Sequence, residues 1–67
     1  MKTCIKALRK ERALSQAELA RELGVTRQTI ISIENERYTA SLVLAYRIAR
    51  FFDKTIEDVF DFSDVEE

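Results

Sequence analysis

Apolar and polar residues follow each other along the chain in short runs with the spacing of helices. The first run contains Ile5 and Leu8, with Ala13 or Leu14 near its end and Lys and Arg between them. It predicts an amphipathic helix over about residues 3–12, with one face against a core.

Two capped runs follow, separated by the single glycine of the sequence. Ser15 precedes Glu18 by three residues, which is the spacing of a capping box, so a second helix should begin there. Gly24 should end it, because glycine adopts a left-handed backbone without steric cost. Thr26 then caps a third helix that ends near Asn35.

The remaining part of the chain, residues 36–67, predicts two more helices and a short tail. Ser41 caps the first, whose apolar residues at helical spacing are Leu42, Ala45, Ile48, Ala49 and Phe52. Thr55 caps the second, which has acidic residues in its first turn, where the helix dipole favours them. Residues 60–62 are strand-like and are able to pair with residues 2–4, whereas residues 63–67 should fray as an acidic tail.

These runs predict an all-α domain of five helices over residues 1–67, with at most a short two-stranded β element at its ends. One Gly, no Pro and 46% hydrophobic residues are typical of a compact helical chain and not of a disordered one. A chain of 67 residues buries only about 60% of the surface that it exposes when unfolded, so we expect modest stability.

Composition excludes most enzyme chemistry. The sequence has no His, which removes imidazole acid/base catalysis and His-ligated metals, and its single Cys is too little for a thiolate cluster. We therefore predict no catalytic residue, no metal and no cofactor. Cys4 is expected to be a small buried hydrophobe, with an exposed thiol as the alternative. No leader or long apolar run is evident, so we expect a cytoplasmic protein without membrane contact.

The net charge of −1 hides an uneven distribution. Residues 1–52 carry ten Lys/Arg and five Glu, which gives +5, and residues 53–67 carry one Lys and seven acids, which gives −6. A basic body with an acidic tail suits a protein that approaches phosphate with one face. A solvated surface of mixed charge is the alternative explanation.

The stretch QAELARELGVTRQTIISIEN over residues 16–35 has the features of a helix-turn-helix. Ala20 is small where the two helices must cross, and Gly24 makes the tight turn. Five further residues supply the apolar contacts that fix the angle between the helices: Leu19, Leu23, Val25, Ile30 and Ile33. We therefore predict a helix-turn-helix whose second helix enters the major groove of DNA.

With Ile30 and Ile33 facing the core, a wheel of the third helix directs Gln28, Ile31, Ser32 and Asn35 outward. Such side chains suit base reading. Gln28 can bond adenine, Arg27 in the first turn can bond guanine, Ile31 can cover a thymine methyl, and Ser32 can serve either kind of base. The alternative is that the outward polar residues only face solvent.

The sequence resembles the lambda-repressor/Cro-type helix-turn-helix family, also called the xenobiotic-response-element family. Beyond the motif, the resemblance covers IEN at 33–35, SLVLAYRIARFF at 41–52 and IEDVFDF at 56–62. That ending resembles very small members that regulate transcription as dimers. The resemblance implies a five-helix lambda-repressor-like DNA-binding domain.

The resemblance also implies roles for single residues. Arg27, Gln28 and Ser32 fall at base-reading positions, and Arg9 and Glu34 match an ion pair between helices one and three that can be purely architectural. The positions implied to contact phosphate are Gln16, Thr26, Asn35, Arg37 and Tyr38. Many relatives have Gly and Pro where this chain has Glu36 and Ala40, which makes the connection between the third and fourth helices harder to predict.

These observations predict a transcriptional regulator, in particular a repressor that binds two-fold symmetric operator DNA as a homodimer. The residues expected at the dimer interface are Phe51, Phe52, Phe60 and Phe62, because four phenylalanines in twelve residues exceed what the core needs; alternatively, all four pack internally. The competing function is an antitoxin or adaptor that binds a protein partner through Ile31, Tyr38 or residues 60–62.

Overall fold

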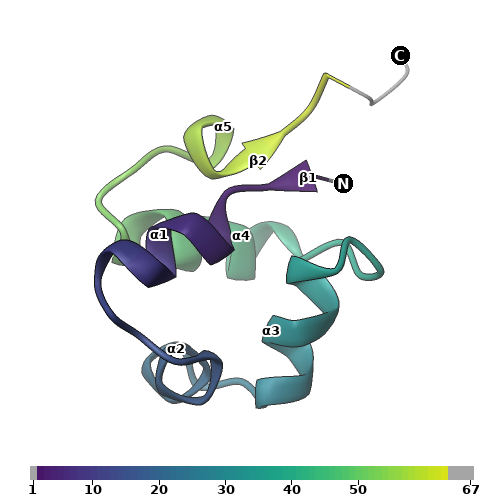
Figure 1. Cartoon of the computed structure of the whole chain (residues 1–67). Coiled ribbons are helices and arrows are strands. Elements are labelled where there is room, and N and C mark those ends of the chain that lie inside the picture. Colours follow the sequence, from purple (N-terminus) through teal and green to yellow (C-terminus); the bar gives the residue numbers. More distant parts are fainter. Residues whose placement is uncertain (1, 64–67) are drawn as a thin grey trace.

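Five helices and a two-residue β ladder form the fold, which a computed structural model describes for residues 2–63 (Figure 1). The elements are β1 (Lys2–Thr3), α1 (Ile5–Glu11), α2 (Gln16–Leu23), α3 (Arg27–Glu34), α4 (Leu42–Phe51), α5 (Ile56–Val59) and β2 (Phe60–Asp61). The predicted five-helix architecture is confirmed. None of the described helices combines the length and apolar character needed to cross a membrane. Of the tail expected to fray, Ser63 is exposed and residues 64–67 lie outside the described part.

The predicted helix starts are confirmed at four hydroxyl caps. The side chains of Ser15, Thr26, Ser41 and Thr55 each accept a backbone N–H three residues later. At Ser15 the capping box is complete, because the backbone N–H of Ser15 donates to the carboxylate of Glu18 at 2.9 Å. This hydrogen bond holds the pKa of Glu18 below its ordinary value.

Helices α1 to α4 end in one common motif. The backbone turns left-handed just after each of them, at Ala13 (φ 55°), Gly24 (φ 71°), Glu36 (φ 61°) and Asp53 (φ 58°). The following N–H returns to a carbonyl five residues earlier, as from Arg37 to Ser32 at 2.9 Å, which is the Schellman motif. Only one of the four positions is glycine, so the other three residues adopt a strained backbone.

We expect Glu36→Gly to stabilise the fold by about 0.5–1 kcal/mol, because glycine adopts a φ of 61° without a Cβ clash. Glu36→Ala is the matched control, since it removes the same carboxylate but keeps the Cβ atom. Urea unfolding followed by circular dichroism measures both. Equal stabilities of the two variants would contradict the assignment of strain to this position.

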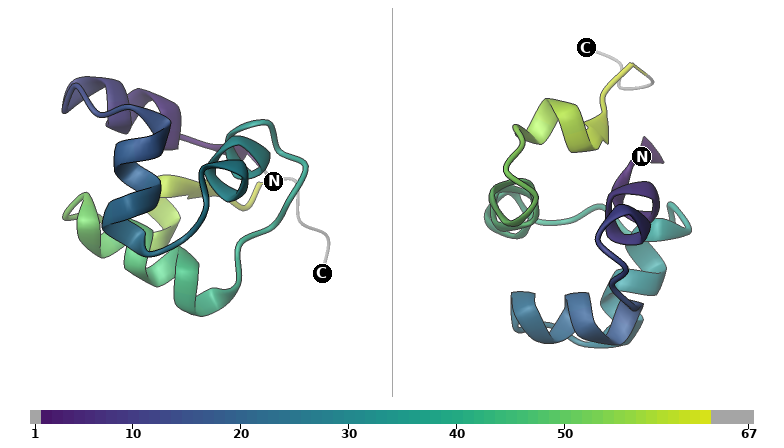
Figure 2. Two further views of the ribbon diagram at one scale, coloured as in Figure 1. Left: turned by 90° about the horizontal axis from the view of Figure 1, so that it is seen from below. Right: turned by 60° about the vertical axis from the view of Figure 1, so that its left-hand side comes forward.

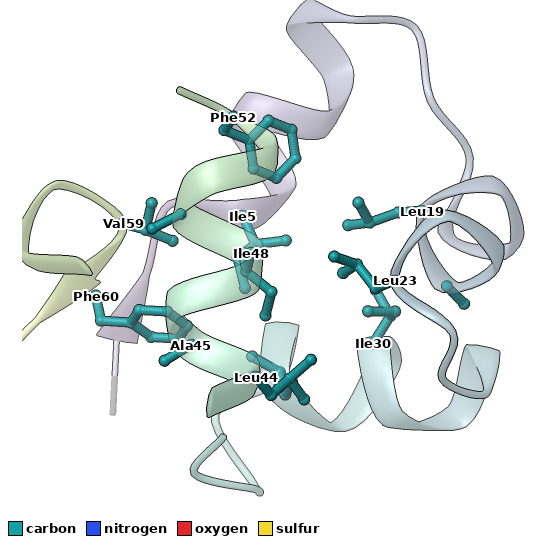
Figure 3. Packing of buried hydrophobic residues seen from close by; sticks show 13 residues of the cluster. Ile5, Leu19, Leu23, Ile30, Leu44, Ala45, Ile48, Phe52, Val59 and Phe60 are labelled. Carbon is teal, nitrogen blue, oxygen red and sulfur yellow. The ribbon is translucent and has the colours of Figure 1, made fainter. Parts of the chain in front are cut away.

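The core lies around α4. Figure 3 shows Ile48 of α4 and Ile5 of α1 facing Leu19 and Leu23 of α2, with Ile30 of α3 beside them. The largest fully buried side chains are Ile5, Leu19, Ile30, Ile33, Ile48 and Val59. Through this packing, α4 holds α1, α2 and α3 in place relative to one another.

Two predictions about apolar residues need correction. Leu42, expected on the core face of α4, is 77% exposed, and Leu44 is buried in its place. Leu42 is the first residue of α4, and the buried stripe of this helix begins two residues later. Phe52 and Phe60, expected at a dimer interface, are each 3% exposed and pack in the core of the chain. Figure 3 shows the Phe60 ring directed from β2 toward Ala45.

The two ends of the described chain pair with each other, as predicted for residues 60–62 and 2–4. Thr3 of β1 lies opposite Phe60 of β2 in an antiparallel ladder. The ladder continues into a hydrogen bond of 2.8 Å from the N–H of Cys4 to the carbonyl of Val59. Cys4 is exposed, so its expected burial is wrong. Cys4 is the N-cap residue of α1, and the buried side chain there is that of Ile5, the first residue of the helix.

Candidate nucleic-acid interface

Helices α2 and α3 form the helix-turn-helix that the motif predicted. Ala20 is 3% exposed and packs in the core where α2 meets α3. The N–H of Val25 donates to the Ala20 carbonyl at 3.0 Å, which closes the turn around Gly24. A larger residue at position 20 would push the two helices apart. Figure 2 shows α3 at the edge of the molecule, with the chain beyond it passing back over the surface to α4.

The outward face of α3 carries the residues proposed to read bases. Arg27 and Gln28 are exposed, whereas Ile31 and Ser32 are half-buried and so less accessible than the helical wheel indicated. The Gln28 amide lies 3.4 Å from the Ser32 hydroxyl, within hydrogen-bond distance. An eight-residue helix is about 12 Å long, close to the width of the major groove.

Tyr38 lies beside this face, because the connection after α3 folds back. A shallow hollow of about 200 Å³ is lined by Thr26, Gln28, Thr29, Ser32 and Tyr38. The Tyr38 ring therefore borders the first half of α3, although ten residues separate it from Gln28 in sequence. A tyrosine there offers a hydroxyl to phosphate and an apolar ring to sugar.

The ion pair implied by the resemblance is present and largely buried. The Arg9 guanidinium donates twice to the Glu34 carboxylate, at 2.8 and 3.1 Å, and once to the carbonyl of Leu14 at 2.9 Å. The side chains of Arg9 and Glu34 are 10% and 3% exposed. The hydrogen bonds to Glu34 raise the pKa of Arg9 above its ordinary value. The carboxylate of Glu34 is thereby neutralised and does not repel phosphate.

Gln16 connects this ion pair to the exposed face of α3. Its amide NH₂ donates to Glu34 at 3.2 Å, and its amide oxygen lies 3.4 Å from the Arg27 guanidinium. The sequence did not predict these contacts, because they join residues from two helices, α2 and α3, that no local spacing relates. With one amide hydrogen held by Glu34, the Gln16 amide has one further hydrogen to donate.

Of the other residues expected to contact phosphate, Thr26 lies at the start of α3 and Asn35 and Arg37 at its end, whereas Tyr38 folds back beside the first half of the helix. Thr26 caps the helix, and its hydroxyl accepts the Thr29 N–H at 3.2 Å. Asn35 is exposed at the C-cap, followed by exposed Arg37 and Tyr38. This set therefore borders the base-reading residues at both ends of the helix.

The phenylalanines expected at a dimer interface do not form one surface. Phe51 is half-buried, and the Arg12 guanidinium lies 5.6 Å from its ring centre and 5.2 Å from that of Phe52. Arg12 also donates to the Phe51 carbonyl at 3.1 Å, which ties α1 to the end of α4. Phe62 alone of the four is exposed, at 44%.

Comparison with known proteins agrees with this geometry. A protein of Methanothermobacter thermautotrophicus is 56% identical over 61 residues, which cover 90% of this chain and 88% of its own. One of Methanocaldococcus jannaschii is 50% identical over 66 residues, covering 98% and 100%, and one of Bacillus subtilis is 45% identical over 60 residues, covering 90% and 91%. All three are named as uncharacterized HTH-type transcriptional regulators. Residues 5–59 match the sequence pattern of the helix-turn-helix family HTH_3, and the chain belongs to this family.

Proposed function

We propose that this protein is a sequence-specific DNA-binding regulator of transcription that inserts α3 into the major groove. The observation that carries the proposal is the exposed pair Arg27 and Gln28 in the first turn of α3. Arg can bond guanine and Gln can bond adenine with two hydrogen bonds each, which is what base discrimination needs. The contact from Gln16 to Arg27 restrains the arginine before DNA arrives, so less side-chain freedom is lost on binding.

The finer part of the proposal is repression from a two-fold symmetric operator by a homodimer. One α3 of eight residues spans few base pairs, and two copies would double the site. Recognition helices that are roughly 34–36 Å apart would enter successive major grooves on one side of the duplex. Occupation of such a site is enough to block a promoter. The cytoplasm, where the chromosome of a prokaryotic relative lies, is the compartment that this function requires.

Fluorescence anisotropy with a labelled random duplex, at low and at high salt, tests the proposal. Binding should weaken steeply as salt rises, because phosphate contacts release counterions. Absence of binding at low salt would overturn the proposal and favour the antitoxin or adaptor. That second candidate draws support from the apolar side chains exposed around α4.

For Gln16→Ala, Asn35→Ala and Arg37→Ala, we expect losses of similar size on every duplex, because phosphate contacts position the protein without reading bases. Arg37→Ala alone removes a charge, so it alone should lower the slope of log affinity against log salt, by about one unit. An unchanged slope for this variant would show that Arg37 does not contact DNA.

A further inference from the structure

One side of the molecule leaves large apolar side chains in solvent. Leu42 is 77% exposed, Val43 70%, Tyr46 55% and Phe62 44%. We call these four residues the α4–β2 patch. Within residues 2–63, the one other exposed large apolar side chain is Tyr38, which borders the hollow on α3. Three of the four side chains come from the first half of α4 and one from the residue after β2, and Leu42 and Phe62 line one groove. Exposed apolar surface of this kind is typical of interaction sites.

A groove of about 190 Å³ runs through the patch. Leu42 and Phe62 line it together with core residues Ala45 and Phe60 and with half-buried Ile56. Figure 1 shows β2 above α4. The groove is almost entirely apolar, so a side chain that enters it should be apolar too.

Opposite charges flank the patch. Leu42 and Tyr46 are four residues apart on the outward face of α4, and exposed Arg50 follows after four more. On the other side, Phe62 shares a second hollow with the exposed acids Glu57 and Asp61. Among residues 2–63 the one side-chain ion pair is Arg9–Glu34, so Arg50 and Glu57 do not neutralise each other within the chain.

We propose that the α4–β2 patch joins two copies of this chain, with the basic rim of each copy facing the acidic rim of the other. A two-fold interface uses the same surface on both copies, so that surface must be self-complementary, and an apolar centre between opposite charges meets this requirement. A standard interface buries about 800 Å² on each side, which is more than four side chains cover. The charged rims must therefore be part of the interface. This proposal rests on the proposed function, which includes the homodimer, and it names the surface that joins the two copies. The surface replaces the phenylalanine interface expected from the sequence.

The position of the patch is compatible with DNA binding. The groove begins at Thr39, directly after Tyr38, and it includes neither Arg27 nor Gln28. Two copies joined there would keep both α3 faces accessible. A different protein on this patch would have to supply the same charge pattern in reverse, whereas a second copy supplies it by symmetry.

Sedimentation velocity of the full chain over the micromolar range tests the surface. Leu42→Glu should raise the dimer dissociation constant at least tenfold, because a carboxylate enters an apolar contact. Position 42 is in the first turn of α4, where the helix dipole favours an acid, so the fold is retained. The matched control is Ala17→Glu, at an exposed position in the first turn of α2. It should leave the dissociation constant unchanged.

Charge reversal then separates a second copy from any other partner. In an Arg50→Glu dimer the two rims that face each other are both acidic, and in a Glu57→Lys dimer Arg50 faces a lysine. Each variant alone should therefore dimerise a few times more weakly than the natural chain. An equimolar mixture of the two should associate more tightly than either variant alone. A mixture no tighter than its components would overturn the proposal.

A natural chain that sediments as a 7.8 kDa monomer throughout this range, or a dimer that Leu42→Glu leaves intact, would also overturn it. The same samples are mixed with a random duplex at low salt. Salt-sensitive binding by the natural chain and by Leu42→Glu upholds DNA binding whatever the result for the patch. Failure of the natural chain to bind DNA would instead overturn the proposed function.

Discussion

Replacing Glu34 with alanine is expected to cost about 3–5 kcal/mol of unfolding free energy, because it leaves the buried Arg9 guanidinium without its counterion. In the natural chain that guanidinium donates twice to Glu34, and only the Leu14 carbonyl would remain. A 67-residue domain has little stability to spare, so the variant should be largely unfolded at 37 °C. Urea and thermal unfolding followed by circular dichroism measure the loss.

The double variant Arg9→Met/Glu34→Met is the control. Removing both charges and filling their space with apolar atoms should restore most of the stability, because the cost comes from an unpaired charge and not from loss of the pair. Gln16 still loses its partner in this variant, so binding to a random duplex should weaken severalfold although the fold is intact. If the double variant is as unstable as Glu34→Ala, or binds DNA like the natural chain, the assigned role of the ion pair is wrong.

Arg27→Ala and Gln28→Ala should each weaken binding to a selected operator by about 1–3 kcal/mol more than binding to random DNA, because each removes a contact that reads a base. The operator is first obtained by selection from a random duplex pool, and anisotropy titrations then compare the two kinds of DNA. Both residues are exposed, so the unfolding free energy should change little.

Lys54→Ala is the control for charge, since Lys54 is an exposed cation just beyond α4. It should affect neither operator nor random binding appreciably. Equal losses on operator and random DNA for Arg27→Ala and Gln28→Ala would contradict base reading and assign these residues to phosphate contact.

The starts of α2 to α5 and the ends of α1 to α3 were predictable from the sequence, whereas α1 begins at Ile5 and not at Thr3, which lies in β1. A hydroxyl cap acts on a backbone N–H three residues later, so Ser15, Thr26, Ser41 and Thr55 are visible as local signals. Of the left-handed positions after α1 to α4, only Gly24 carries the residue type that marks such a turn. Ala13, Glu36 and Asp53 adopt the same backbone without that residue type.

The candidate site was predictable where a single helix determines it. The wheel of α3 placed Gln28 and Asn35 outside correctly, because helical geometry alone decides this. The half-burial of Ser32 and the contacts of Gln16 depend on segments from elsewhere in the chain, in particular the connection that folds back to Tyr38. The exposure of Leu42 was missed for a similar reason, since apolar character alone does not tell a core residue from a docking residue.

Binding of DNA by the α3 face is checked by backbone amide chemical shifts during titration of ¹⁵N-labelled protein with a random duplex. We expect the largest salt-sensitive changes at the start of α2 and from Thr26 to Tyr38, with small changes in α1 and α5. Changes confined to the α4–β2 patch, or no change at a DNA excess in low salt, would contradict binding by this face.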